Sequence, residues 1–272
     1  MKALVILRLA LALVLSASFG FAPAFAQARA TQAALQRVSQ VAGPQLLDLE
    51  GPNGTLRAAV FRPSGSGPFP VLVVLHGGGG IIPRFLDWAA RFTSAEYVVL
   101  VGCWARPLAP AVAVACPTLP PPLDVSLRAT EAAGVLIDAA RRLPGVRSES
   151  LGLIGWSWGA TLAALVASSG ADVRAVVAIA GAYRQNLSPT DVPPLDRVAR
   201  LQAPVLLLHG KRDFTINVEE STNYEAAARA AGKSVEIFLY DDADHFMILF
   251  DPATGEEVSR RSVAFLNRYL RP

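Results

Sequence analysis

A serine set between two tryptophans and two glycines is the first feature of this 272-residue chain that could do chemistry. Ser157 lies in the stretch GWSWG, after the apolar run LGLI and before the small residues GATLAALVA. A tight turn from strand to helix exposes a serine hydroxyl, and Gly155 and Gly159 leave space where the strand and the helix pass closely. We therefore interpret Ser157 as the nucleophile of an acyl-transfer reaction.

A serine hydroxyl is a poor nucleophile until a base accepts its proton, and the chain offers three histidines. His76 and His209 each end an apolar run and precede a glycine, which is typical of a hydrogen bond at a strand end. His245 lies instead in the polar stretch YDDADHFM, beyond the last apolar run. We predict that His245 is the general base.

The base needs a carboxylate that holds it in one tautomer. Asp213, in the stretch LLLHGKRDF, lies in a loop that leaves another predicted strand and can reach the loop of His245. The loop after the preceding predicted strand offers no carboxylate as a rival. The aspartates closest to His245 in sequence have the pattern of a solvated turn; they are Asp241, Asp242 and Asp244. Asp213 is the predicted acid.

Backbone amides for a developing oxyanion are available in the stretch HGGGG, residues 76–80, which follows a predicted strand. We predict that the amides of Gly78 and Gly79 form the oxyanion hole with the amide of Trp158. A phosphate-binding role is excluded, because no lysine follows as a P-loop requires and Ile82 stands where a dinucleotide fingerprint needs its last glycine. We expect no cofactor.

Strands and helices must bring these residues together. The strongest apolar runs are typical of strands buried on both faces; they are PVLVVLHG (70–77), YVVLVG (97–102), SLGLIGWS (150–157), VRAVVAIAG (173–181), APVLLLHG (203–210) and SVEIFLY (234–240). The alternating stretch TLRAAVFRP (55–63) predicts an edge strand. Between the runs lie helical patterns, one that Asp124 can cap and one that Asn217 can cap. The alternation predicts one α/β domain whose mainly parallel sheet gathers functional groups at the carboxyl ends of its strands.

The first 26 residues have the pattern of a secretory signal peptide. Lys2 and Arg8 lie in its opening, and a short apolar core follows. The segment ends at 24–26 with an alanine on either side of a phenylalanine, the small-x-small pattern of a cleavage site. An uncleaved anchor is the alternative. We expect a periplasmic or secreted protein without a stable membrane anchor after cleavage, with a polar tether over 27–44 and the catalytic domain over 45–272.

Charge and cysteine content indicate whether the chain binds nucleic acid or a metal ion and whether it forms a disulfide. The basic residues are scattered and the formal net charge is only +3, so no dense basic stripe for a nucleic-acid backbone is present. Cys103 and Cys116 are the two cysteines of the chain, and in an oxidising compartment they are most simply a disulfide. Neither has a nearby Cys or His at metal-ligand spacing, and we predict no metal site.

The motifs HGGGG, GWSWG, HGKRD and DADHF follow one another in an order that resembles the α/β-hydrolases. From about residue 45 to the end, the chain is most similar to the dienelactone-hydrolase-like branch. This resemblance implies an eight-stranded core flanked by helices and a triad of Ser157, Asp213 and His245. Enzymes that open dienelactones typically carry cysteine at the nucleophile position, so the serine here favours a more general ester hydrolase.

Together these observations predict a serine hydrolase that cleaves small carboxylic esters or lactones through an acyl-enzyme intermediate. The alternatives are an acyltransferase or a peptidase with the same triad, or a non-catalytic binding protein. Residues 182–202 have room for a loop and a short helix around 195–201, which excludes a large cap domain of the kind inserted there in this superfamily. We therefore expect an open substrate pocket walled mainly by Trp156, Trp158 and the loop that carries Trp104; the alternative is that these indoles pack beneath the helices. The sequence leaves the oligomeric state open.

Overall fold

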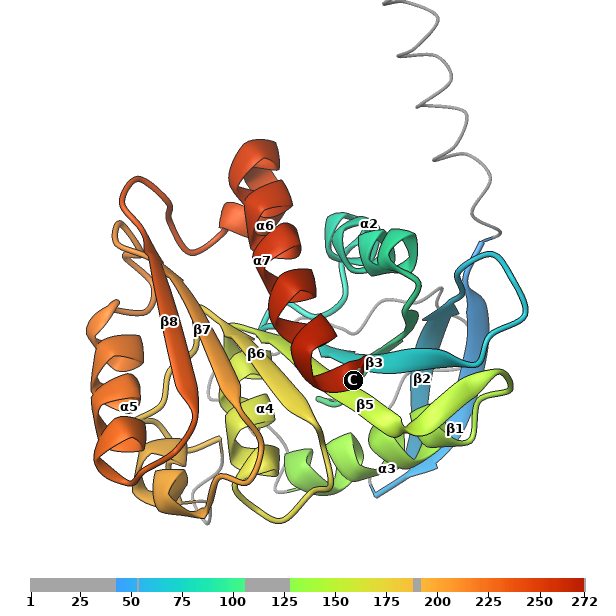
Figure 1. Cartoon of the computed structure of the whole chain (residues 1–272), viewed down its shortest axis with the longest axis horizontal. Helices are drawn as coiled ribbons and strands as arrows, with labels where there is room; N and C mark the ends of the chain where they lie inside the picture. The colour runs from blue at the N-terminus through green and yellow to red at the C-terminus, as the bar shows by residue number, and fades with distance from the viewer. Residues whose placement is uncertain (1–42, 53, 106–127, 188–191, 272) are drawn as a thin grey trace, which may run out of the picture. The chain divides into compact units, whose positions relative to one another are not determined.

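Eight strands form one sheet in the part of the chain that the computed structural model describes, residues 43–52, 54–105, 128–187 and 192–271 (Figure 1). The strands are β1 (Gln45–Gly51), β2 (Gly54–Phe61), β3 (Phe69–Leu75), β4 (Val98–Gly102), β5 (Val146–Trp156), β6 (Ala175–Ile179), β7 (Val205–Gly210) and β8 (Val235–Tyr240). Their order is β1-β2-β4-β3-β5-β6-β7-β8. Six adjacent strands of this order pair in parallel, namely β4, β3, β5, β6, β7 and β8. The strands β1 and β2 are antiparallel to their neighbours. The predicted mainly parallel, eight-stranded sheet is confirmed.

The central strand β5 shows why its apolar run needs no polar face. Leu151 and Leu153 pack into one hydrophobic core, and Ile154 and Trp156 pack into a second core on the other side of the sheet. Successive side chains of a strand point to opposite faces, so a strand covered on both sides must be apolar throughout. The sequence pattern therefore reflects a sheet buried between two layers of helices.

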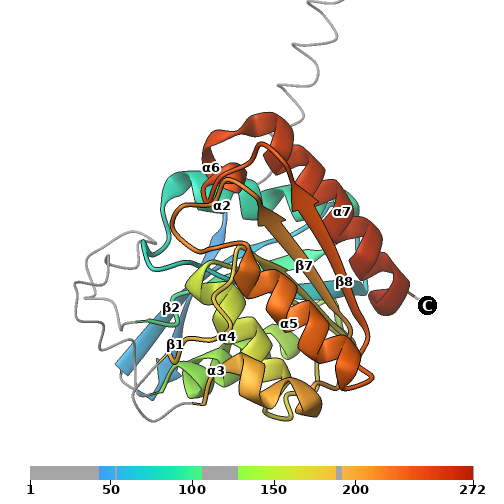
Figure 2. The same ribbon diagram turned by 90° about the vertical axis from the view of Figure 1, so that its left-hand side faces the viewer.

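Helices cover both faces of this sheet (Figures 1 and 2). One layer contains α3 (Ala129–Arg141), α4 (Trp158–Ala167) and α5 (Glu219–Ala230). The other contains α2 (Pro83–Ala90), the short α6 (Met247–Phe250) and α7 (Pro252–Leu270), with the 3₁₀ helix η1 (Arg91–Ala95). Among the described residues, no helix combines the length and the apolar character needed to cross a membrane.

The position of the predicted edge strand is wrong. The stretch 55–63 corresponds to β2, and β1 covers its outer side. Asp48 of β1 lies directly opposite Arg57 of β2, and their side chains form an ion pair at 2.7 Å. The pattern of β1 is weak because its outward residues are exposed, so the sequence indicated only where the domain begins.

Two local predictions in the second half of the chain agree with the structure. The side chain of Asn217 accepts a hydrogen bond from the Glu219 amide at 2.9 Å, at the start of α5. Between β6 and β7, the short helix expected around 195–201 is the 3₁₀ helix η2 (Pro194–Arg200). Asp124, the other predicted cap, lies outside the described residues.

Candidate active site

Ser157 occupies the turn between β5 and α4 in a backbone conformation that few side chains adopt. Its φ and ψ angles are 57° and −123°, and its amide donates to the Ile179 carbonyl at 2.8 Å. A non-glycine residue with positive φ is strained, and such strain is typical of functional turns. The predicted tight turn from strand to helix is present, and Ser157 is held at its tip.

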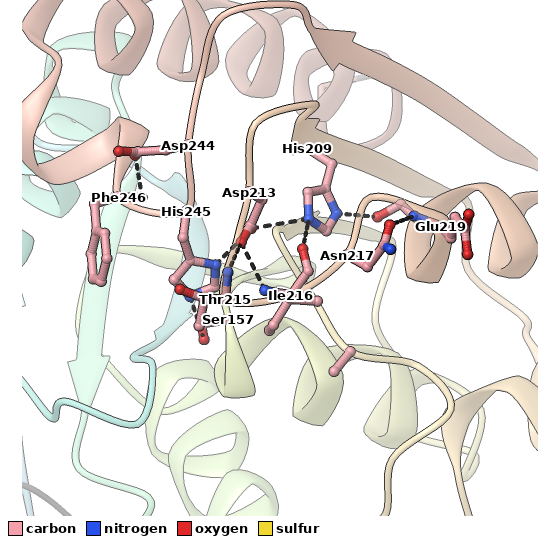
Figure 3. Close-up of polar contacts among 12 residues, drawn as sticks. Ser157, His209, Asp213, Thr215, Ile216, Asn217, Glu219, Asp244, His245 and Phe246 are labelled. Atoms are coloured by element: carbon pink, nitrogen blue, oxygen red, sulfur yellow. Dashed lines mark hydrogen bonds and ion pairs between the residues drawn. The ribbon is translucent and has the colours of Figure 1, made fainter.

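The structure brings Ser157, His245 and Asp213 into one hydrogen-bonded row, although they lie far apart in the sequence (Figure 3). The Oγ atom of Ser157 lies 2.9 Å from Nε2 of His245. Nδ1 of His245 lies 2.7 Å from Oδ2 of Asp213. Because a carboxylate only accepts, Nδ1 carries the ring proton, and Nε2 is left to accept the proton of the serine hydroxyl.

Strand order explains why these residues meet. Ser157 follows β5, Asp213 follows β7 and His245 follows β8, and these parallel strands end at the same edge of the sheet. The loops after β7 and β8 are joined directly, since the Arg212 amide donates to the Ala243 carbonyl at 3.0 Å. Parallel sheets collect functional groups at this edge.

Asp213 is buried and accepts hydrogen bonds on both of its carboxylate oxygen atoms. Its Oδ1 accepts the amides of Thr215 at 2.8 Å and Ile216 at 2.7 Å, and its Oδ2 contacts His245 and His209. Burial by itself raises the pKa of the Asp213 carboxyl, but the hydrogen bonds from His209, His245 and Ile216 outweigh it and hold that pKa well below its ordinary value. Asp213 is therefore a carboxylate at neutral pH.

The loop HGGGG lies beside the serine, as its predicted role requires. A Cβ atom added to Gly77 would lie 3.1 Å from the Cβ of Ser157, and one added to Gly78 would lie 3.1 Å from the indole of Trp158. A Cβ atom added to Gly79 would meet no atom within 4 Å, so Gly79 borders open space. Trp158 is the first residue of α4, and first-turn amides of a helix have no acceptor within the helix. Gly77 and Gly78 thus lie beside Ser157 and Trp158, and the oxyanion hole formed by Gly78, Gly79 and Trp158 remains a prediction.

The predicted pocket walls Trp104 and Trp156 pack inside the domain instead. Trp104 is 1% exposed, stacks on His76 at 5.2 Å between ring centroids, and donates from Nε1 to the His76 carbonyl at 3.0 Å. Trp156 is 5% exposed and donates from Nε1 to the His245 carbonyl at 3.0 Å. The Nε1–H group is the only polar group of an indole, and in both tryptophans it donates to a backbone carbonyl of a loop at the site. These two tryptophans support the site from behind, whereas Trp158 is half-buried.

The two other histidines take different parts. His76 lies with Nδ1 2.7 Å from the Gly77 carbonyl, and burial lowers its pKa to about 4, so it is uncharged at neutral pH. His209 was predicted to make only a strand-end hydrogen bond, but its Nε2 lies 3.1 Å from Asp213. Sequence reasoning missed this contact. The available signal was the spacing HGKRD, which places His209 and Asp213 around the same strand end.

The structure describes one of the two cysteines of the predicted disulfide. Cys103 is buried just after β4, whereas Cys116 lies outside the described residues. The Cys103–Cys116 pair therefore remains a prediction.

The described part of the chain contains no group of three or more His, Cys, Asp or Glu residues arranged to hold a metal ion.

Comparison with known proteins gives matches over most of the chain. The sequence model of the dienelactone hydrolase family matches residues 56–269. A protein from Bradyrhizobium sp. named "Probable 2-oxo-3-(5-oxofuran-2-ylidene)propanoate lactonase" is 26% identical over 240 residues, 81% of this chain and 92% of its own length. An Escherichia coli protein named "Putative carboxymethylenebutenolidase" is 26% identical over 260 residues, 92% of this chain and 95% of its own length.

The fold has a counterpart among solved structures. A Klebsiella pneumoniae protein named "Putative Dienelactone Hydrolase" matches with a TM-score of 0.72 at 23% identity. The match covers 83% of this chain and 98% of the other. This likeness shows that the sheet and its flanking helices have the same fold as that protein.

Proposed function

Because this chain belongs to the dienelactone hydrolase family, we propose that it is a serine hydrolase that cleaves small carboxylic esters or lactones through an acyl-enzyme on Ser157. One observation carries the proposal. The hydroxyl of Ser157 lies 2.9 Å from Nε2 of His245, whose Nδ1 lies 2.7 Å from a buried carboxylate. A nucleophile, a base and an orienting acid within hydrogen-bond reach of one another are what serine acyl transfer requires.

In the first half of the reaction, a bond forms between Oγ of Ser157 and the substrate carbonyl carbon while the hydroxyl proton passes to His245. Asp213 accepts the Nδ1 hydrogen bond and stabilises the imidazolium that results. The carbonyl electron pair moves to its oxygen, which becomes an oxyanion. The amide of Trp158 and those of Gly78 and Gly79 are the proposed donors to it, and the amino end of α4 adds its favourable dipole.

Collapse of this intermediate restores the carbonyl and breaks the bond to the leaving oxygen, which takes the proton from His245. From a simple ester the alcohol departs. From a lactone the new hydroxyl stays attached to the acyl group, because opening a ring yields one molecule. Water, deprotonated by His245, then attacks the acyl-enzyme, and the acid and free Ser157 are released.

Small lactones and esters are the first substrates to test. The Bradyrhizobium relative is named as a lactonase and matches over most of both chains, which favours a lactone or ester carbonyl over a peptide bond. Between β6 and β7, the described residues form a loop and η2 and leave no large cap over the site. Such a site suits small, soluble acyl groups.

The experiment compares wild-type protein and Ser157→Ala on a panel of acyl esters, γ-lactones, thioesters and peptides. We expect ester or lactone turnover that falls about 10⁶-fold in the variant, because members of a triad act as a unit. A serine-directed phosphonate should add its mass to a peptide containing Ser157, whereas thiol alkylation should leave turnover intact. Near-normal turnover by Ser157→Ala, or activity on peptides alone, would contradict the proposal.

We also propose that residues 1–26 direct export and that Cys103 pairs with Cys116. The support is the charged start, the short apolar core and the small-x-small ending of the leader, together with the presence of two cysteines in the chain. Mass spectrometry of the exported protein tests the first point, since cleavage should leave a chain that begins at Gln27.

A further inference from the structure

The acid of the proposed triad has a second histidine on the same oxygen atom as the first. Nε2 of His209 lies 3.1 Å from Oδ2 of Asp213, the atom that also contacts His245 (Figure 3). His209 and Asp213 are both buried, so water does not compete for this contact. His209 is the last residue but one of β7, a strand that is hydrogen-bonded to β6 on one side and to β8 on the other.

The neighbours of His209 fix its tautomer. Nε2 faces two atoms that can only accept, Oδ2 of Asp213 and the Ile216 carbonyl at 3.0 Å, so it carries a proton. Nδ1 lies 2.7 Å from the hydroxyl of the buried Ser221, in the first turn of α5. With the ring proton on Nε2, Nδ1 accepts a hydrogen bond from that hydroxyl. Ser221 therefore holds His209 as a donor toward Asp213.

This donor completes the set around the carboxylate. The amides of Thr215 and Ile216 occupy Oδ1, but without His209 the only donor on Oδ2 would be His245 itself. His245 has to change its charge during each turnover, so it is a poor anchor for the group that must orient it. A donor on a strand that is paired on both sides, with no part in the proton transfer, can hold Oδ2 at a constant place.

On the basis of the proposed function, we infer that His209 is a positioning residue for the reaction. Its Nε2, oriented by the contact between Nδ1 and Ser221, donates to the Asp213 oxygen that orients His245. The inferred chain runs from Ser221 through His209 and Asp213 to His245. Two roles are thereby separated between two histidines on one carboxylate. His245 moves protons, and His209 keeps the carboxylate still.

The test compares three substitutions of His209 that separate position from mere packing. His209→Gln keeps an amide donor near the place of Nε2, whereas His209→Asn moves its amide toward the place of Nδ1 and Ser221. His209→Leu has no donor. We expect kcat to fall about 10- to 100-fold in the Asn and Leu variants, the effect of one hydrogen bond to a charged group, with KM changed less than about threefold. The Gln variant should keep kcat within about fivefold of wild type.

A matched control removes a buried hydrogen bond elsewhere. Tyr97→Phe deletes the 2.7 Å contact between Tyr97 and Asn267, at the opposite end of β4 from the site. It should lower the melting temperature and leave kcat unchanged. An NMR measurement needs no substrate, since the far-downfield Nδ1 proton of His245 should persist in His209→Gln and broaden or shift in His209→Asn.

Three results would overturn the inference. They are equal loss of kcat in the Gln and Asn variants, wild-type kcat in the Leu and Asn variants, and failure of both amide variants to fold, which would make His209 a structural residue only. Ser157→Ala is measured in the same series. If Ser157→Ala keeps full activity, the proposed function fails, whereas loss of activity in Ser157→Ala without an effect of His209→Asn refutes this inference alone.

Discussion

Gly155 and Gly159 approach each other across the turn that carries Ser157 with no space for a side chain between them. A Cβ atom added to Gly155 would lie 2.1 Å from the carbonyl oxygen of Gly159. One added to Gly159 would lie 2.1 Å from the carbonyl oxygen of Leu75, at the end of β3. The two glycines therefore let α4 leave the sheet directly behind the serine.

Gly159→Ala is expected to destabilise the protein by more than about 4 kcal/mol or to prevent folding, because the three atoms nearest to the new methyl group all belong to the backbone. Urea unfolding measures the change. Gly134→Ala is the control, since Gly134 lies within α3 and nothing is found within 4 Å of its added Cβ atom. It should stabilise the protein by about 0.5 to 1 kcal/mol through helix propensity. Equal behaviour of the two variants would contradict the packing argument.

Asp213→Asn is expected to lower kcat about 10⁴-fold while the protein stays folded, because the amide no longer stabilises the imidazolium of His245 and can favour the wrong tautomer. Initial rates with the best substrate of the panel measure it. Asp241→Asn is the matched control, as Asp241 is exposed and pairs with Lys211 at 2.7 Å. Its kcat should equal that of wild type. An equal effect of the two substitutions would remove Asp213 from the mechanism.

The fold was largely predictable because a sheet buried on both faces produces continuous apolar runs that are hard to mistake. Six of the eight strands follow such runs, and the turn at Ser157 follows from its glycines and its place between a strand and a helix. The strand β1 has half-exposed residues and no such run. Its identification depended on pairing with β2, which a local pattern does not contain.

Side-chain partners were less predictable, since they depend on which loops meet in space. Glu220 is an acidic residue in the first turn of α5, a position that by itself favours the helix dipole. In the structure it is buried and accepts the amides of Tyr183 and Arg184 at 2.7 and 2.8 Å, together with the Arg184 guanidinium. Tyr183 and Arg184, in the loop after β6, lie 37 and 36 residues before Glu220 in the sequence. Nor does a local pattern show that Ser221 contacts His209.

His76 should make the stability of the protein depend on pH between about 4 and 6.5. Burial lowers its pKa from 6.5 to about 4 in the folded state. In that window the unfolded state binds a proton and the folded state does not, so stability rises with pH and is lost on acidification from 6.5 toward 4. The loss amounts to about 3 kcal/mol. Urea unfolding at several pH values should show a shallower dependence for His76→Gln, and an unchanged dependence would contradict the assignment.

The proposed disulfide between Cys103 and Cys116 should contribute about 3 kcal/mol to stability, the value of the chain-entropy model for so short a loop. Intact-mass analysis with alkylation, before and after reduction, detects it. Protein purified from an oxidising compartment should take up no alkyl group until it is reduced. Reduction should then lower the midpoint of urea unfolding. Two thiols that react without reduction would rule the disulfide out.

Trp104 should affect stability more than substrate choice, which reverses the expectation from sequence. Trp104→Ala leaves a cavity behind the loop HGGGG and deletes the hydrogen bond to the His76 carbonyl, and we expect a loss of about 3 to 5 kcal/mol. Trp104→Phe keeps most of the packing and should lose about 1 kcal/mol with the donor. In both variants the ratio of kcat/KM for short and long acyl esters should match wild type. A shifted ratio without a fall in melting temperature would mean that Trp104 lines the substrate pocket after all.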